Sequence, residues 1–143
     1  CRFIIMKKLL LLLLFIPFVF SCSKDSNLPA IYLEIGDMYA GGIVFQVNGS
    51  GTSGLVARTG DSGAMNWYEA MDSESNGWSV PSISQLETMY NTIGQGADNI
   101  GNFADGTYWA SNEGGYVLNF ANGIRSSGWN RILNFRVRLI SSF

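Results

Sequence analysis

The chain has 143 residues, a formal net charge of −2, two cysteines and no histidine, which fits one small domain behind a leader. With no histidine and no cysteine after Cys22, the chain cannot build a Ser-His or Cys-His nucleophile. From Cys22 onward, six basic side chains stand against eleven acidic ones, a formal charge of −5. Nucleic acid is therefore not an expected partner.

The first element along the chain is a leader. Met6 precedes Lys7, Lys8 and an apolar run over residues 9–20, which is the pattern of a secretory signal. We interpret Met6 as the start and residues 1–5 as upstream sequence. The run reaches only about 18 Å as a helix, short of the ~30 Å hydrocarbon core that a spanning helix must cross. Residues 1–21 are therefore predicted to be upstream sequence and a signal helix.

The end of the leader resembles the lipobox of bacterial lipoproteins, with Val19, Ser21 and the acceptor Cys22. That resemblance implies a diacylglycerol on the Cys22 thiol and a third acyl chain on its amine, and several chains together anchor a protein firmly. We expect a bacterial envelope protein held by membrane lipid. Ser23 does not resemble the signal for inner-membrane retention, so we expect the outer membrane, at its periplasmic face or on the cell surface. The alternative is an ordinary small residue after a cleaved signal.

Residues 22–30 are polar and predict a tether, and residues 31–143 form the expected domain. Segments rich in aromatic and β-branched residues alternate with Gly, Asn and Ser, which predicts strands joined by turns. We predict a hairpin from residues 43–47 and 55–57 around a glycine-rich loop. Further strands are predicted at 108–110, 116–120 and 135–140.

The last of these strands alternates apolar residues with Arg136 and Arg138. We expect one face of the strand to lie in the core and the other to be solvent-exposed or salt-bridged. Eight acids and no base lie between Arg58 and Arg125, so the arginines near the end of the sequence are expected to neutralise this acidic middle across the fold.

Two helices are predicted. After Pro81, apolar residues at intervals of three, three, one and three indicate a helix over residues 83–93. It has two candidate capping boxes, Ser82 with Gln85 or Ser84 with Glu87. A shorter helix is expected over residues 67–71.

Read in order, these segments resemble a family of exported bacterial domains of unknown function, named after the C-terminal domain of a Legionella collagen-like protein. The resemblance implies a C-type-lectin-like fold, an α+β architecture with a twisted antiparallel sheet, two helices and long loops that carry function. The matching residues span almost the whole expected domain: Gly41–Phe45, Gly54–Ala57, Trp67, Gly77–Ser82, Leu86, Tyr90, Tyr108–Ser111, Glu113, Phe120 and Arg136–Arg138.

Sugar-binding lectins of this fold take two calcium ligands from a Trp-Asn-Asp run. The nearest match here is Trp129-Asn130-Arg131, and a guanidinium cannot ligate a cation. The loop over residues 94–106 offers Asp98, Asn102 and Asp105 as weak calcium candidates, but it matches no EF-hand spacing. Such residues also populate loops because they tolerate left-handed backbone. We therefore predict no metal or other cofactor, and calcium is the one cation that these oxygens would suit.

Four tryptophans stand out in so short a domain. We expect Trp67, Trp78 and Trp109 in the core, because they lie in the motif segments and each can bury ~200 Å². Trp129 lies in a polar loop and is predicted to be partly exposed.

Our leading hypothesis is a binding module without catalysis that presents the loops at 94–106, 112–116 and 125–131 to a glycan or an envelope protein. One alternative is a structural envelope lipoprotein without a soluble ligand. Another is a carbohydrate-active enzyme that uses two carboxylates among Asp98, Asp105 and Glu113. The candidate binding residues are Trp129, Asn130, Tyr116, Asn112, Glu113 and Asp105.

Overall fold

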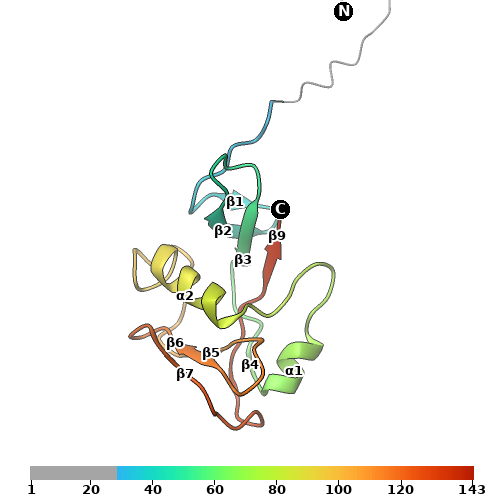
Figure 1. Ribbon diagram of the computed structural model, residues 1–143, viewed down its shortest axis with the longest axis vertical. Helices are drawn as coiled ribbons and strands as arrows, with labels where there is room; N and C mark the ends of the chain where they lie inside the picture. Colours follow the sequence, from blue (N-terminus) through green and yellow to red (C-terminus); the bar gives the residue numbers. More distant parts are fainter. Residues whose placement is uncertain (1–28) are drawn as a thin grey trace, which may run out of the picture.

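Two small β-sheets and two helices make up the α+β fold of the computed structural model, which describes residues 29–143 (Figure 1). The expected signal helix and the lipid-acceptor Cys22 lie outside the described residues. The first sheet is antiparallel, in the order β1 (Met38–Tyr39), β2 (Gly42–Val47), β3 (Gly54–Arg58), β9 (Ile140–Ser142). The second has the order β4 (Ala64–Met65), β8 (Phe135–Arg136), β5 (Thr107–Trp109), β6 (Val117–Asn119), β7 (Ile124–Ser126).

The predicted hairpin is confirmed, because β2 and β3 pair in antiparallel register. In its loop, Asn48 Oδ1 accepts hydrogen bonds from the backbone N–H groups of Thr52 and Ser53 at 2.9 and 3.3 Å. The loop also binds the preceding segment, since Leu33 N–H donates to the carbonyl of Gly51 at 2.9 Å. Strand β1 and the hairpin therefore form one end of the molecule, beside the point where the described chain begins (Figure 1).

The strand predicted over residues 135–140 is wrong as a single element, because it divides into β8 and β9. Residues 137–139 cross from the second sheet to the first, and their backbone bonds go to the last residue of β3 and to the β3–β4 connection. The Ser62 N–H donates to the Val137 carbonyl at 2.8 Å, and the Arg58 N–H donates to the Leu139 carbonyl at 2.9 Å. We expected a single antiparallel sheet, but this crossing divides the strands between two sheets. In the second sheet, β5 and β8 pair in parallel.

Each helix begins at a capping box. Helix α2 (Ile83–Thr92) has Ser82 as its N-cap, with a reciprocal capping box to Gln85, so the first of the two candidate boxes is the correct one. Helix α1 (Trp67–Asp72) has a capping box from Asn66 to Glu69. No helix among residues 29–143 is both long and apolar enough to cross a membrane.

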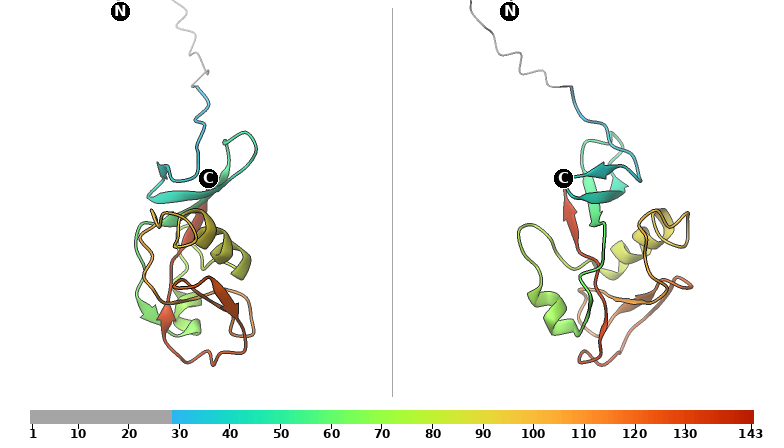
Figure 2. Two further views of the ribbon diagram at one scale, coloured as in Figure 1. Left: turned by 90° about the vertical axis from the view of Figure 1, so that its left-hand side faces the viewer. Right: turned by 180° about the vertical axis from the view of Figure 1, so that it is seen from behind.

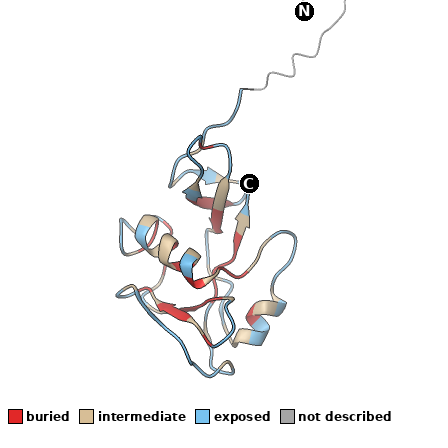
Figure 3. Cartoon of the chain, in the orientation of Figure 1, coloured by how far each residue is buried: buried red, intermediate tan, exposed pale blue. Residues whose placement is uncertain are grey.

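The core divides into two apolar clusters. Buried residues lie along strands of both sheets (Figure 3). Trp109 is fully buried and donates its indole N–H to the Met65 carbonyl at 2.9 Å. Trp67 and Trp78 pack at the edge of the same cluster and are partly buried. The prediction of core positions is therefore confirmed in full for Trp109 and in part for the other two.

Arg138 is the one charged side chain of the described core, with 1% of its surface exposed. Its Nε donates to Asp61 Oδ1 at 2.7 Å, and its Nη1 donates to the carbonyls of Arg58 and Gly101 at 2.9 and 2.8 Å. The guanidinium also lies 4.1 Å from the centre of the Phe103 ring. One buried cation thus joins the crossing segment, the β3–β4 connection and the loop at 94–106, and the salt-bridged face that we expected is confirmed at this residue.

Asp61 also accepts a hydrogen bond from the Tyr108 hydroxyl at 2.9 Å, and that hydroxyl in turn accepts the N–H of Ala104 at 3.0 Å. Burial of the ring disfavours the phenolate and raises the pKa of Tyr108 from 10.0 to about 12. The N–H of Ala104 opposes this rise, and the charge of Asp61 adds to it. The Tyr108 hydroxyl is therefore a protonated donor throughout the neutral range.

Replacing Arg138 with methionine is expected to lower the free energy of unfolding by about 3–5 kcal/mol, because the change removes a buried charge from its ion pair and leaves the partly buried Asp61 without its main partner. Arg136→Met is the matched control. Its guanidinium binds the same carboxylate at 3.4 Å but is 45% exposed, so its loss should cost less than about 1 kcal/mol. Urea unfolding followed by tryptophan fluorescence measures both changes. Equal losses in the two variants would contradict the role given to Arg138.

The folded protein holds the Tyr108 proton more tightly than the unfolded chain does. Its contribution to stability is therefore complete below pH 10 and is lost as the pH rises towards about 12. Tyr108→Phe should be less stable at neutral pH, because Asp61 and Ala104 each lose a hydrogen bond. The variant should then lose less stability than the native protein between pH 10 and 12. Unfolding curves across this range test the expectation, with Tyr68→Phe, an exposed ring, as control.

Candidate binding surface

Two loops lie side by side at the end of the molecule opposite the β2–β3 hairpin (Figures 1 and 2). One joins β5 to β6 and the other joins β7 to β8. Gly128 N–H donates to the Gly114 carbonyl at 2.8 Å and Trp129 N–H to the Gly115 carbonyl at 3.3 Å. Gly115 has φ +67°, and a Cβ there would lie 2.2 Å from the Trp129 carbonyl oxygen. Only glycine therefore allows the two loops to meet.

Trp129 is 44% exposed, which confirms the prediction of a partly exposed ring. Its indole N–H donates to Ser126 Oγ at 2.7 Å, and its ring meets Phe135 edge to face at 5.4 Å. The side chain is thus fixed by one hydrogen bond and one aromatic contact. Much of its surface still faces solvent.

The same loop continues onto helix α1. The Arg131 carbonyl accepts the N–H of Trp67 at 2.9 Å. The Arg131 guanidinium lies 5.0 Å from the centre of the Trp67 ring and 5.3 Å from that of Tyr68. Arg131 makes no salt bridge within residues 29–143. Cation–π contacts therefore order a positive charge that has no acidic partner in the described chain.

Exposed apolar side chains surround this arginine. Ile132 and Leu133 follow it directly, and the Tyr68 ring is half exposed. We call this set the aromatic loop surface: Tyr68, Trp129, Arg131, Ile132 and Leu133. Among these residues only Trp129 was predicted as a binding residue from the sequence, because it alone is a large ring in a polar loop.

The other residues predicted at these two loops have structural partners or stand apart. Asn112 Oδ1 accepts the N–H of Ile83 at 2.8 Å and so caps α2. Asn130 Oδ1 accepts the N–H of Ile132 at 3.2 Å within its own turn. Tyr116 packs partly buried against the larger core cluster, whereas Glu113 is exposed. The amides of both asparagines thus stabilise the loops.

The loop at 94–106 does not join this surface. It precedes β5, whereas the loop at 112–116 follows β5, so the two loops lie at opposite ends of the β5–β6 hairpin. Asp105 accepts a hydrogen bond from Gln95 Nε2 at 3.0 Å. The structure therefore does not bring this loop together with the other two.

The weak calcium candidates of that loop, Asp98, Asn102 and Asp105, are exposed. Asp105 already accepts a hydrogen bond from Gln95. The carbonyls of Gly101 and Asn102 already accept hydrogen bonds from the Arg138 guanidinium. A cation at these carbonyls would lie against that positive charge. Within residues 29–143, no three Asp, Glu, His or Cys side chains are grouped to hold a metal ion.

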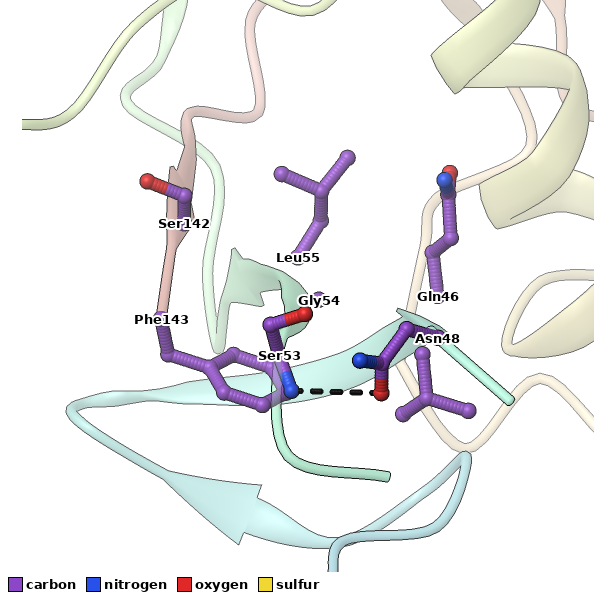
Figure 4. A pocket seen from close by; sticks show the side chains of 8 residues that line it. Gln46, Asn48, Ser53, Gly54, Leu55, Ser142 and Phe143 are labelled. Carbon is purple, nitrogen blue, oxygen red and sulfur yellow. Dashed lines mark hydrogen bonds between the residues drawn. The ribbon is translucent and has the colours of Figure 1, made fainter. Parts of the chain in front are cut away.

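Two shallow hollows lie at the hairpin end. One, of about 390 Å³, is lined by apolar Val47, Leu55 and Phe143 and by polar residues of the hairpin and β9 (Figure 4). The bond between Asn48 Oδ1 and Ser53 N–H crosses its wall. The other, of about 330 Å³, lies between residues 32–35 and the hairpin loop. The lining of the first has no titratable side chain, and that of the second has only Tyr32 and Glu34. The aromatic loop surface therefore remains the better candidate site.

No model of a known protein family matches the chain, and a search of curated proteins finds no relative.

Gly115→Ala should separate the two loops, because the new Cβ would overlap the Trp129 carbonyl. We expect a loss of about 1–2 kcal/mol from the left-handed backbone and about 1 kcal/mol more for each of the two broken hydrogen bonds. Gly128→Ala is the control, since its φ is also positive but nothing lies within 4 Å of the added Cβ. Urea unfolding and the Trp129 emission maximum report both effects. A Gly128 variant as damaged as the Gly115 variant would contradict the steric argument.

Proposed function

We propose that this protein is an envelope lipoprotein, acylated at Cys22, whose domain is a C-type-lectin-like binding module. It acts without catalysis and binds an envelope protein through the aromatic loop surface. The observation that carries the proposal is Trp129, a large ring held in place and left 44% exposed.

The composition of this surface supports a macromolecular partner. Trp, Tyr and Arg are the side chains that most often dominate the free energy of protein interfaces. Here one of each lies beside exposed Ile132 and Leu133. Because the Trp129 and Arg131 side chains are already ordered by internal contacts, binding would cost them little conformational entropy. The neighbouring apolar side chains favour a protein over a glycan.

A sugar ring is the second candidate ligand, favoured by one feature. The exposed part of the Trp129 indole offers a flat aromatic surface, on which the apolar face of a sugar could stack. Asn130 would contribute little to such a site, because its side-chain oxygen is bound within its own turn.

The lectin-like fold and the absence of catalysis belong to the same proposal. Two helices, hairpins and long connecting loops are features that the resemblance implies. A glycosidase would need two carboxylates about 5–10 Å apart on one cleft. Asp105 and Glu113 flank opposite ends of β5, which favours binding over hydrolysis.

Trp129→Ala is expected to reduce affinity for the partner at least ~30-fold, the loss typical of a central aromatic at an interface. Stability should fall little, because nearly half of the side chain faces solvent and it makes only one hydrogen bond and one aromatic contact. Ile124→Ala is the matched control, an apolar residue that is 62% exposed and lies outside the surface. Pull-down from envelope extracts identifies a protein partner, and a glycan array tests the sugar. Retention of every captured ligand by the Trp129 variant would refute the proposed site.

A further inference from the structure

A second group of exposed apolar side chains lies far from the aromatic loop surface. Residues 31–38 carry four of them: Ile31, Tyr32, Ile35 and Met38. We call these residues the N-terminal apolar segment. Ile100 extends the group, because a Cβ on Gly36 would lie 2.9 Å from Ile100 Cδ1, and it is exposed as well. Apolar side chains gathered in this way on a small domain mark a contact surface.

The segment is held in place by the β2–β3 hairpin. Leu33 N–H donates to the Gly51 carbonyl at 2.9 Å, and Gly36 N–H donates to the Val44 carbonyl at 2.8 Å. Figures 1 and 2 show it in blue at the end of the domain opposite the loop at 127–134. The exposed side chains therefore belong to an ordered surface at one end of the molecule.

The position of this segment along the chain indicates which surface it contacts. Ile31 follows Cys22 by nine residues, which can span at most roughly 30 Å. A lipid anchor at Cys22 therefore keeps Ile31, the first residue of the segment, within that distance of the bilayer. A tether this short also raises the effective concentration of the surface, so that individually weak contacts become populated.

From the exposed side chains and the length of the tether we infer that the N-terminal apolar segment lies against the bilayer surface and orients the domain on it. This inference rests on the lipid anchor of the proposed function. Tyr32 suits the interface because its ring is apolar and its hydroxyl remains hydrated. The aromatic loop surface then points away from the membrane, towards its partner.

Charge indicates which lipids take part. Residues 29–57 contain Glu34 and Asp37 and no lysine or arginine. Anionic headgroups would repel these carboxylates, so the contact depends on apolar insertion and should form on zwitterionic lipid. Added salt should leave it unchanged.

Photo-crosslinking tests this contact directly. The chain over residues 22–143, which keeps every described residue, is coupled through Cys22 to a maleimide lipid in phosphatidylcholine vesicles. A benzophenone amino acid replaces Tyr32, which is 71% exposed, or Ile124 as control, which is 62% exposed and belongs to the opposite sheet. We expect at least fivefold more lipid adduct from position 32. A third probe at Ile35 should resemble position 32.

Equal lipid adducts from positions 32 and 124 would overturn the inference. So would adducts from position 32 to a second copy of the chain, because the segment would then be a self-association surface. The coupled protein supplies its own anchor, so this result does not depend on acylation in cells. Mass spectrometry of the protein from a bacterial host tests acylation of Cys22 separately, and a bare thiol would refute the anchor of the proposed function.

Discussion

The ion pair between the buried Arg138 and the partly buried Asp61 is the interaction on which the rest of the structure depends. An unpaired ion in the core costs several kcal/mol, and Asp61 gives the Arg138 guanidinium a carboxylate partner at 2.7 Å. Together they bind backbone groups and a hydroxyl from segments that lie far apart along the chain. Many small domains use disulfides for the same purpose, but no cysteine occurs in residues 29–143. Here an ionic network holds the loops together.

Local signals in the sequence predicted the local parts of the fold. Ser82 and Gln85 define the start of α2 because a capping box needs only residues three apart. The loop after Val47 indicated the hairpin through its glycines. The division of residues 135–140 between two sheets was not predictable in this way. Alternation of arginine and apolar residues describes a strand, but it does not say that the chain leaves one sheet for another. The partner of Arg138 was equally hidden, because Asp61 precedes it by 77 positions.

The candidate site was predicted only in part, because local sequence does not show which distant side chains pack together in the fold. Trp129 stood out because a large ring in a polar loop has few packing partners nearby. Tyr68 did not, since it adjoins Trp67 in a short helix and could have faced the core equally well. Asn112 and Asn130 were predicted as binding residues, but their side-chain oxygens accept backbone N–H groups of the fold. Asparagine serves caps and turns as readily as ligands, and only the positions of the Ile83 and Ile132 amides reveal which role each one has.

The pairing of β9 with β3 has a consequence for the order of folding. Leu55 pairs with Ser142 and Ala57 with Ile140, so this ladder has a very high contact order and its closure is slow. Until residues 140–142 pair with it, β3 is the unpaired edge strand of the β2–β3 hairpin. Such an edge can pair with another chain and aggregate. The nascent protein is therefore most vulnerable at β3, and the first sheet is complete only when the strand beyond the buried arginine is in place.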